Sequence, residues 1–458
     1  MSADRPLRVA VVGSGPAGFY AAGRLLASDV PVEVDMIERL PTPWGLVRLG
    51  VAPDHPNIKV VSRVFEKIAQ RPGFRFLGNV EVGRDLEPSD LVRLYDAVVY
   101  AVGAQTDRRL GIPGEDLPGS WPATAFVAWY NGHPDFQQLS FDLSSKRAVV
   151  VGNGNVAIDV ARMLALAETE LAPTDTTDAA IAAILGSGIQ EILVLGRRGP
   201  AQASFTTPEL KELGELADAD VAVDPADLDL DPVSELALAE STVARNLEVL
   251  REYAARAPSG KRRTLRLRFR ASPVAILGDG QVEAIEVARN TLVADDRGSV
   301  RAVPAGEREV IPCGIVFRSV GYRGVPVPGV PFDEERHTIR NRDGRVLDEH
   351  GEPLPGVYCT GWIKRGPTGI IGTNKKDAMQ TVELLLEDAR TGALPRLEEA
   401  SAERVDAALA ERACDVVTYA GWEAIDRVER GRGEEHGRPR VKLVSWDDLL
   451  STALQGVS

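Results

Sequence analysis

A short glycine-rich turn near the start of the chain is the first feature that could do chemistry. It matches G-x-G-x-x-G and consists of Gly13, Ser14, Gly15, Pro16, Ala17 and Gly18. An apolar run at residues 8–12 precedes it and a helical pattern at 16–28 follows, which is the context in which this motif binds a dinucleotide pyrophosphate. The backbone N–H groups at the start of the helix would then face the phosphates.

An acidic residue, Glu38, follows the next expected strand, at residues 32–37. A carboxylate in this place accepts hydrogen bonds from a ribose diol and would repel a 2′-phosphate. The first turn is therefore predicted to bind FAD or NAD rather than NADP. The alternative is a glycine turn without a ligand, which the combination of strand, helix and acid makes the weaker interpretation.

A second turn has the weaker pattern G-x-G-x-x-A but the same context of strand and helix. It consists of Gly152, Asn153, Gly154, Asn155, Val156 and Ala157. The next strand pattern, at residues 192–195, is followed by Arg197 and Arg198, where the first unit has an acid. Guanidinium groups bind phosphate in bidentate fashion, so this pair predicts NADP. A solvated basic pair is the alternative.

The elements that must position these turns are two strand–turn–helix–strand units, at residues 8–39 and 146–198. Their strands are short, apolar and rich in β-branched residues, as buried parallel strands are. The second unit is longer than usual, and its extra residues, about 168–188, are expected to form an additional helical excursion. Alternation of such strands with helices predicts a doubly wound α/β fold.

The composition narrows the class of protein further. The chain has 458 residues, 44% of them hydrophobic, and a formal net charge of −14, which argues against a general nucleic-acid binder. No apolar run is long enough to predict a membrane span or a secretory signal, so no membrane insertion is expected and a cytoplasmic location is the prediction. Cys313, Cys359 and Cys414 are far apart in sequence, which fits free thiols in a reducing compartment.

Two longer segments carry a resemblance to a known family. Residues 40–56 read LPTPWGLVRLGVAPDHP, and residues 361–374 read GWIKRGPTGIIGTN. With the two turns, they make the chain similar to adrenodoxin reductase and its bacterial relatives, the NADPH–ferredoxin reductases. The resemblance spans residues 8 to about 450. It implies a flavoenzyme that uses FAD and NADP(H), with hydride passing from NADPH to the flavin and electrons leaving to a ferredoxin, which often serves a cytochrome P450.

The resemblance also implies the domains and the roles of single residues. The fold would be α/β with two Rossmann-like domains, the NADP domain (105–325) being inserted in the FAD domain (1–104 and 326–458). The FAD-binding residues would be those at 13–18 with Glu38, Leu46, Val82, Trp362, Gly369, Ile370 and Ile371. The NADP-binding residues would be Arg108, Asn153, Gly154, Asn155, Val156, Arg197, Arg198 and Glu209, with Glu209 beside the two arginines at the adenosine end.

Two residues are candidates for proton handling, although each has a plain alternative. His55 lies near the flavin in the resemblance, but it could equally be a structural histidine in a proline-rich turn. Glu212 lies three residues after Glu209 on one expected helix face and could approach the nicotinamide. A solvated glutamate is at least as good an interpretation.

A basic island in this acidic chain is a candidate docking site for an acidic ferredoxin. Arg266, Arg268 and Arg270 alternate along an expected strand and would share one face. Positive charge there would speed the encounter with an acidic partner. The alternatives are a solvated strand face and a basic patch assembled from several segments.

The sequence argues against two other functions, and a third can be tested by experiment. A disulfide reductase of the same superfamily needs a redox-active cysteine pair, and the sequence has neither C-x-x-C nor C-x₄-C. An electron-input subunit like that of glutamate synthase would bring cysteine-ligated clusters ahead of the first turn, which here begins at residue 13. A nucleotide-binding module without activity would be colourless and unresponsive to NADPH.

Overall fold

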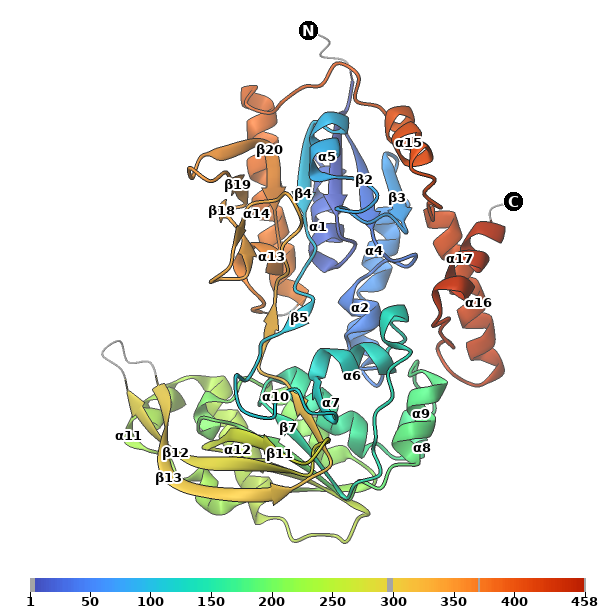
Figure 1. The fold of residues 1–458 in the computed structure, drawn as a ribbon. Coiled ribbons are helices and arrows are strands. Elements are labelled where there is room, and N and C mark those ends of the chain that lie inside the picture. Colours follow the sequence, from blue (N-terminus) through green and yellow to red (C-terminus); the bar gives the residue numbers. More distant parts are fainter. Residues whose placement is uncertain (1–4, 295–299, 370, 457–458) are drawn as a thin grey trace.

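The computed structural model describes residues 5–294, 300–369 and 371–456, which form two lobes, one built on a mixed, largely parallel sheet and the other on a parallel sheet (Figure 1). The sheet of the first lobe has the order β18-β19-β20-β4-β1-β2-β3. Its strands come from both ends of the chain: β1 (Leu7–Val12), β2 (Val32–Glu38), β3 (Phe74–Gly78), β4 (Ala97–Tyr100), β18 (Asn341–Arg342), β19 (Arg345–Leu347) and β20 (Pro353–Cys359). The second sheet is made only of residues 120–318, so one lobe is inserted in the other.

The first sheet is covered on both faces, because alternate residues of its strands belong to different apolar clusters. In β1, Val9 and Val11 pack with Phe19 and Leu385, whereas Val12 packs on the opposite face. The helices around this sheet are α1 (Pro16–Leu25), α2 (Leu46–Leu49), α3 (Pro56–Lys59), α4 (Ser62–Ala69), α5 (Pro88–Leu94), α13 (Trp362–Arg365) and α14 (Ile371–Thr391). Strands β1, β2, β3, β4 and β20 are parallel, so their carboxyl ends share one edge.

The second sheet has the order β6-β14-β7-β8-β10-β9, and all its neighbours are parallel. Its strands are β6 (Ser120–Pro122), β7 (Arg147–Val151), β8 (Glu191–Leu195), β9 (Ala219–Val223), β10 (Arg263–Arg268) and β14 (Ile315–Arg318). The helices on one face include α6 (Ala123–Tyr130), α7 (Asn155–Ala165), α10 (Thr207–Glu212) and α12 (Ser241–Ala255). An antiparallel sheet covers the other face: β11 (Ala271–Leu277), β12 (Ala284–Ala294) and β13 (Val300–Pro312).

The predicted α/β fold with two doubly wound units is confirmed, including the helical excursion. That excursion contains α8 (Glu168–Leu171) and α9 (Asp178–Leu185). One detail of the basic island is wrong: β10 ends at Arg268, and Arg270 lies beyond it with a φ of 53°. The chain turns there, so only Arg266 and Arg268 share a strand face.

The C-terminal segment ties the two lobes together. Helices α15 (Ala402–Glu411), α16 (Tyr419–Glu435) and α17 (Trp446–Gln455) lie beside the first sheet (Figure 1). Between α16 and α17, the fully buried Lys442 contacts Asp175 of the helical excursion at 3.1 Å, and Lys59 of the first lobe reaches the same carboxylate at 2.7 Å. Arg438 donates to backbone oxygens of the same excursion. These contacts restrict the orientation of one lobe relative to the other.

The chain crosses between the lobes on a two-stranded link. β5 (Thr106–Asp107) pairs antiparallel with β15 (Tyr322–Arg323). The Tyr322 ring lies 5.2 Å from that of Trp362 in the first lobe. The carboxylate of Asp107 accepts hydrogen bonds from the backbone N–H and the hydroxyl of Thr124, at the start of α6 in the second lobe. Each strand of the link is thus anchored to a different lobe.

Burial raises the pKa of Asp107 to about 6, and the hydrogen bonds from Thr124 oppose this shift. Because the folded pKa lies above the ordinary value, Asp107 favours folding below about pH 4, and this contribution is lost as the pH rises through about 6. Asp107→Asn removes the titration. We expect its free energy of unfolding, relative to the unmodified protein, to rise by about 2 kcal/mol between about pH 4 and pH 8. Thermal unfolding at both pH values tests this, and a difference independent of pH would contradict it.

Candidate functional site

The first glycine turn needs glycine at two positions for plain steric reasons. Gly13 has a φ of 104°, and a Cβ there would lie 2.6 Å from the backbone oxygen of Ala101. A Cβ on Gly18 would lie 2.0 Å from the oxygen of Gly13, so only glycine lets α1 pack this closely on the turn. The backbone N–H of Gly13 donates to the oxygen of Ile37 at 2.8 Å, which joins the turn to β2.

Gly15 is different, because a Cβ there would have no heavy atom within 4 Å. Gly15 is the N-cap of α1, and because it has no side chain it cannot cap the first N–H groups of the helix. Two other segments approach the turn closely: a Cβ on Gly45 would lie 3.0 Å from the Cα of Gly15, and a Cβ on Gly361 would lie 2.6 Å from that of Ala17. The result is a crowded cradle with open space in front of Gly15, which fits a pyrophosphate.

Glu38 lies at the end of β2, beside this turn. Its Oε2 accepts hydrogen bonds from the backbone N–H of Ser14 at 3.0 Å and from its hydroxyl at 2.7 Å, and Oε1 accepts from the N–H of Leu40 at 3.0 Å. A carboxylate has about four lone-pair sites, so the three bonds leave capacity for a ribose hydroxyl. The three hydrogen bonds therefore fix the Glu38 carboxylate beside the turn.

Buried charges position the segment that follows, residues 44–50. Arg48 makes a bidentate pair with Glu429 of α16, at 2.8 and 2.6 Å, and both side chains are almost fully buried. Leu46, an expected FAD contact, begins α2 immediately after Gly45, and its side chain is exposed. Val82 follows β3 and is half-buried against the other apolar face of the sheet. Both therefore lie beyond the carboxyl ends of the strands.

The second long segment approaches the same turn from the other end of the chain. Trp362 is half-buried, and its indole N–H donates to the backbone oxygen of Thr368 at 3.2 Å. Gly369 has a φ of 80°, and Ile371 begins α14. Ile370, another expected FAD contact, lies outside the described residues.

The second glycine turn repeats the geometry of the first. Gly152 has a φ of 129°, and a Cβ there would lie 2.0 Å from the oxygen of Ser319. At Gly154 a Cβ would meet only the Cβ of Ser204, at 3.9 Å, which again leaves space before a helix N-terminus. The Nδ2 of Asn153 is buried and has no hydrogen-bond partner among the described residues. The site thus presents a free donor and an open N-terminus, which suits a second pyrophosphate.

The other two predicted residues of this turn contact the protein itself. The Oδ1 of Asn155 accepts a hydrogen bond from the backbone N–H of Thr206 at 2.8 Å. Val156 packs against the apolar cluster beneath the second sheet. Asn155 therefore fixes the segment that leads into α10, and the backbone of both residues remains at the helix start.

Arg197 and Arg198 follow β8 directly. Within the described ranges neither makes an ion pair; Arg198 donates only to the backbone oxygen of Gln202, at 3.4 Å. Partial burial and the positive charge of Arg197 lower the pKa of Arg198. Two cations held together without a carboxylate form a receptor for an anion, because binding a phosphate would relieve their mutual repulsion.

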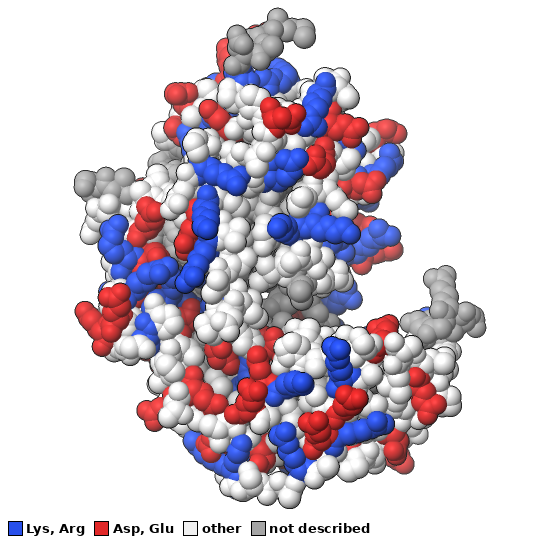
Figure 2. All heavy atoms as spheres, turned by 180° about the vertical axis from the view of Figure 1, so that it is seen from behind, with Lys and Arg blue, Asp and Glu red and all other residues white. Residues whose placement is uncertain are grey.

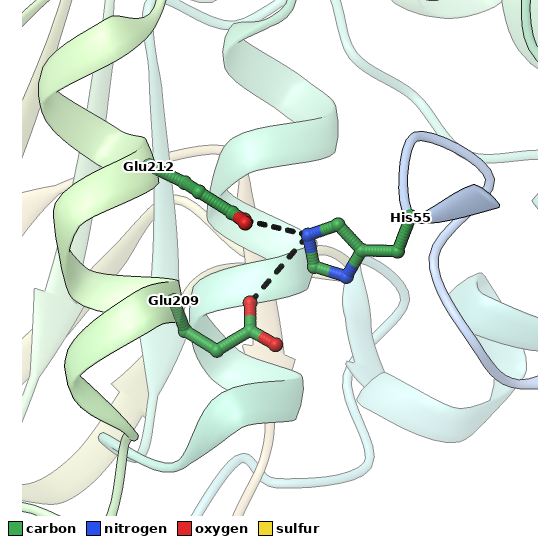
Figure 3. A group of neighbouring side chains, drawn as sticks. All are labelled: His55, Glu209 and Glu212. Carbon is green, nitrogen blue, oxygen red and sulfur yellow. Dashed lines mark hydrogen bonds and ion pairs between the residues drawn. The ribbon is translucent and has the colours of Figure 1, made fainter. Parts of the chain in front are cut away.

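A charged cluster joins the two lobes (Figure 3). Nε2 of His55, from the first lobe, lies 2.7 Å from Oε2 of Glu212 and 3.6 Å from Oε2 of Glu209, both on α10. Arg162 of α7 lies among them, 2.8 Å from Glu212 and 3.1 Å from Glu209. His55, Glu209 and Glu212 lie close enough together to ligate a metal ion. The guanidinium of Arg162, however, already supplies positive charge to the two carboxylates.

Two more carboxylates complete this cluster. Arg162 also contacts Asp54 at 2.7 Å and Asp159 at 3.0 Å. Burial raises the pKa of Asp159 to about 7, with the neighbouring charge of Glu209 as a smaller cause and Arg162 opposing it. The structure thus brings His55 together with the two carboxylates of α10, a contact that the sequence analysis did not predict.

Some predicted neighbours do not come together. Glu209 was expected beside Arg197 and Arg198, but its carboxylate is buried against Arg162 and His55. Arg108 is exposed on the link between the lobes, where its backbone N–H donates to the oxygen of Gly321 at 2.9 Å. Sequence reasoning missed Arg162, although its spacing of three from Asp159 on an otherwise apolar helix was a usable signal.

The free cysteines are distributed over three places. Cys313 and Cys359 are buried in different lobes, and Cys414 is half-buried after α15. Burial raises the pKa of the Cys313 thiol to about 12, which makes it unreactive.

No helix among the described residues combines the length and apolar character needed to cross a membrane.

Comparison with known proteins identifies the family of this chain. Residues 7–193 match the model of the pyridine nucleotide-disulphide oxidoreductase family. The chain is 52% identical to NADPH-ferredoxin reductase FprA of Mycobacterium tuberculosis, covering 98% of this chain and all of that one. It is 41% identical to the mitochondrial NADPH:adrenodoxin oxidoreductase of Arabidopsis thaliana, covering 99% of this chain and 96% of the other.

A solved structure agrees with the sequence comparison. The structure of M. tuberculosis FprA in complex with NADPH superposes with a TM-score of 0.94 over 98% of this chain, at 52% identity, and is covered completely. Identity at this level over the full length leaves one assignment. The chain belongs to the NADPH–ferredoxin reductases of the FprA and adrenodoxin reductase type.

Proposed function

We propose that this protein is a ferredoxin–NADP(+) reductase that passes electrons from NADPH through FAD to a ferredoxin-type iron–sulfur protein. The observation that carries the proposal is that the two glycine turns have similar backbones but oppositely charged neighbours. Each has an open helix N-terminus, but Glu38 lies beside one and the unpaired Arg197 and Arg198 follow the strand of the other. One site accepts a ribose diol and the other a 2′-phosphate. The names of the relatives agree with this donor and acceptor.

The two lobes divide the binding between them in this proposal. Residues 1–104 and 326–458 hold FAD: Gly15 and the start of α1 face the pyrophosphate, and Glu38 binds the ribose. Leu46, Val82, Trp362 and the start of α14 lie along the flavin. Residues 105–325 hold NADPH, with Asn153 to Val156 at the pyrophosphate and Arg197 and Arg198 at the 2′-phosphate.

When bound, the flavin accepts a hydride from NADPH and releases electrons singly, which is chemistry that the protein side chains do not supply. The residues of the chain set the geometry. The contacts of Lys442 and Lys59 with Asp175 hold the two lobes, and with them the two proposed cofactor sites, in one arrangement.

His55 and Glu212 come from different lobes, and their 2.7 Å contact lies between the cofactor sites of this proposal. In the proposal they hold or move a proton at the imidazole Nε2 while the lobes stay joined. Arg162, by pairing with Glu209 and Glu212, fixes which carboxylate oxygens face the imidazole.

A disulfide reductase is the competing function, because the matched family model is described by that activity. Such an enzyme needs two thiols beside the flavin, and the three cysteines here are free and separate. The test is to measure NADPH oxidation with ferredoxin and with an oxidised dithiol as acceptors, in the unmodified protein and with all three cysteines replaced by serine. We expect ferredoxin reduction to survive the replacements. Turnover of the dithiol that disappears in the variant would contradict the proposal.

The docking site for ferredoxin stays a prediction. Arg266 pairs with Glu191 at 3.1 Å and Arg268 with Glu309 at 2.7 Å, so part of their charge is offset. On the face shown in Figure 2, basic and acidic side chains alternate over the lower lobe. A ferredoxin that docks at Arg266 and Arg268 must compete with these acidic partners. The cytoplasmic location and the downstream enzyme, such as a cytochrome P450, are likewise predictions from sequence.

Neutralising the two arginines tests this docking prediction. In Arg266→Gln with Arg268→Gln, we expect the second-order rate of ferredoxin reduction to fall about threefold to tenfold at low salt, because electrostatic steering weakens. Ferricyanide reduction should not change. Equal slowing with both acceptors, or no slowing with ferredoxin, would place the docking site elsewhere.

A further inference from the structure

The turn at residues 360–362 must be held in an unusual conformation. Gly361 has a φ of 76°, and a Cβ on it would lie 2.6 Å from the Cβ of Ala17, so its backbone lies directly against α1. Gly361 is also the N-cap of α13, and no side chain caps that helix from within. Something outside the turn has to fix its polar groups.

That group is Asp377, which reaches the turn from the second turn of α14. Its Oδ2 accepts hydrogen bonds from the backbone N–H of Gly361 at 2.5 Å and from the hydroxyl of Thr360 at 3.0 Å. Its Oδ1 lies 2.9 Å from the Nζ of Lys364, near the end of α13. One carboxylate, only 7% exposed, therefore holds both the start and the end of this short helix.

The neighbours of Asp377 on α14 strengthen this attachment. Thr381, one turn later, accepts a hydrogen bond from Lys364 at 3.1 Å, and Asn374, one turn earlier, accepts one from Arg365 at 2.7 Å. Residues three and four apart lie on one helix face, so α14 presents a polar stripe to α13. In this stripe only Asp377 contacts the backbone of Gly361.

A carboxylate matters here because the position after the glycine is a tryptophan. Trp362 cannot accept hydrogen bonds, since its indole is a donor only. The side chain after Gly361 therefore supplies no negative charge to this turn. Asp377 on α14 supplies one, by accepting a hydrogen bond from the backbone N–H of Gly361. Hydrogen bonds to an ionised acceptor are about twice as strong as neutral ones, and burial strengthens them further.

We infer that Asp377 is a positioning residue for the flavin: it clamps the Gly361 turn against α1 and so fixes the backbone on which the flavin rests. The inference rests on the proposed function, which places FAD along Trp362 and the start of α14. It goes beyond that function because Asp377 acts through the backbone that it holds.

The experiment compares Asp377→Asn with Asp388→Asn, a matched control on the same helix. Asp388 is also a paired carboxylate, but it binds Arg345 and Tyr358, away from the Gly361 turn. FAD affinity is measured by the fluorescence released when FAD dissociates, and the visible circular dichroism of bound flavin reports its orientation. We expect Asp377→Asn to weaken FAD binding about tenfold to hundredfold and to alter the flavin dichroism. Asp388→Asn should do neither.

Thr360→Val serves if Asp377→Asn does not fold, since it removes one hydrogen bond and no charge. We expect it to weaken FAD binding about threefold to tenfold. Affinity and dichroism equal to those of Asp388→Asn, in whichever variant folds, would overturn the role of Asp377. If the unmodified protein itself retains no FAD, the proposed function fails first, and the inference with it.

Discussion

Replacing Arg197 and Arg198 together by alanine is expected to weaken NADPH binding about 100-fold to 1,000-fold. Each guanidinium has free donors in the structure, and losing two sets of charge-assisted hydrogen bonds to a phosphate removes about 3–4 kcal/mol of binding free energy. NADH has no 2′-phosphate, so its affinity should change less than about threefold. The measurement is the dissociation constant of each nucleotide, taken from titration of the flavin spectrum.

A matched control for this variant is Arg427→Ala with Arg432→Ala. These arginines are exposed on α16 in the other lobe, so the same net charge is removed from the chain. The control should leave both dissociation constants unchanged. An equal loss of affinity for NADPH and NADH in Arg197→Ala with Arg198→Ala would mean that the pair does not read the 2′-phosphate.

The second large effect is expected from a single methyl group on the first turn. Gly15 has a φ of −73°, which any residue adopts, and a Cβ there would touch nothing. Gly15→Ala should therefore fold normally, while its methyl occupies the space that the pyrophosphate needs. We expect FAD affinity to fall about tenfold to hundredfold, measured by FAD retention after dialysis and by fluorescence titration.

Two further glycines make this result specific. Gly154→Ala places a methyl in the equivalent space of the second turn and should weaken NADPH binding while FAD is retained. Gly431→Ala, on an exposed face of α16 where a Cβ also meets nothing, should affect neither cofactor and should stabilise the helix slightly. Full FAD occupancy in Gly15→Ala would contradict the assignment of the first turn.

The parts of this site that the sequence predicted are those governed by local chemistry. The glycine turns follow from backbone sterics, and the Gly13 and Gly152 conformations are the ones the motif requires. The acid at the end of β2 and the arginines after β8 are adjacent to the turns because parallel strands end at one edge. Each turn and its charged residue lie within one strand–turn–helix–strand unit, so their spacing in the sequence indicates that they belong to one site.

The parts that the sequence did not predict depend on contacts between distant segments. Arg48 with Glu429 and Lys442 with Asp175 join residues more than 250 positions apart, and no periodicity signals such pairs. The error at Arg270 has a local cause, because the strand ended two residues earlier than its alternation suggested. Glu209 contacts Arg162, a buried cation on another helix, and that contact between distant segments has no signal in the sequence.

The protein is expected to pass electrons in order from NADPH through a flavin to a separate one-electron carrier. Anaerobic stopped-flow mixing tests it most directly: the oxidised protein is mixed with NADPH or NADH, and oxidised ferredoxin is then added. We expect NADPH to bleach the visible flavin absorbance much faster than NADH does, and ferredoxin to restore it while becoming reduced. A protein without flavin absorbance, or a reduced flavin that ferredoxin cannot reoxidise, would contradict the account.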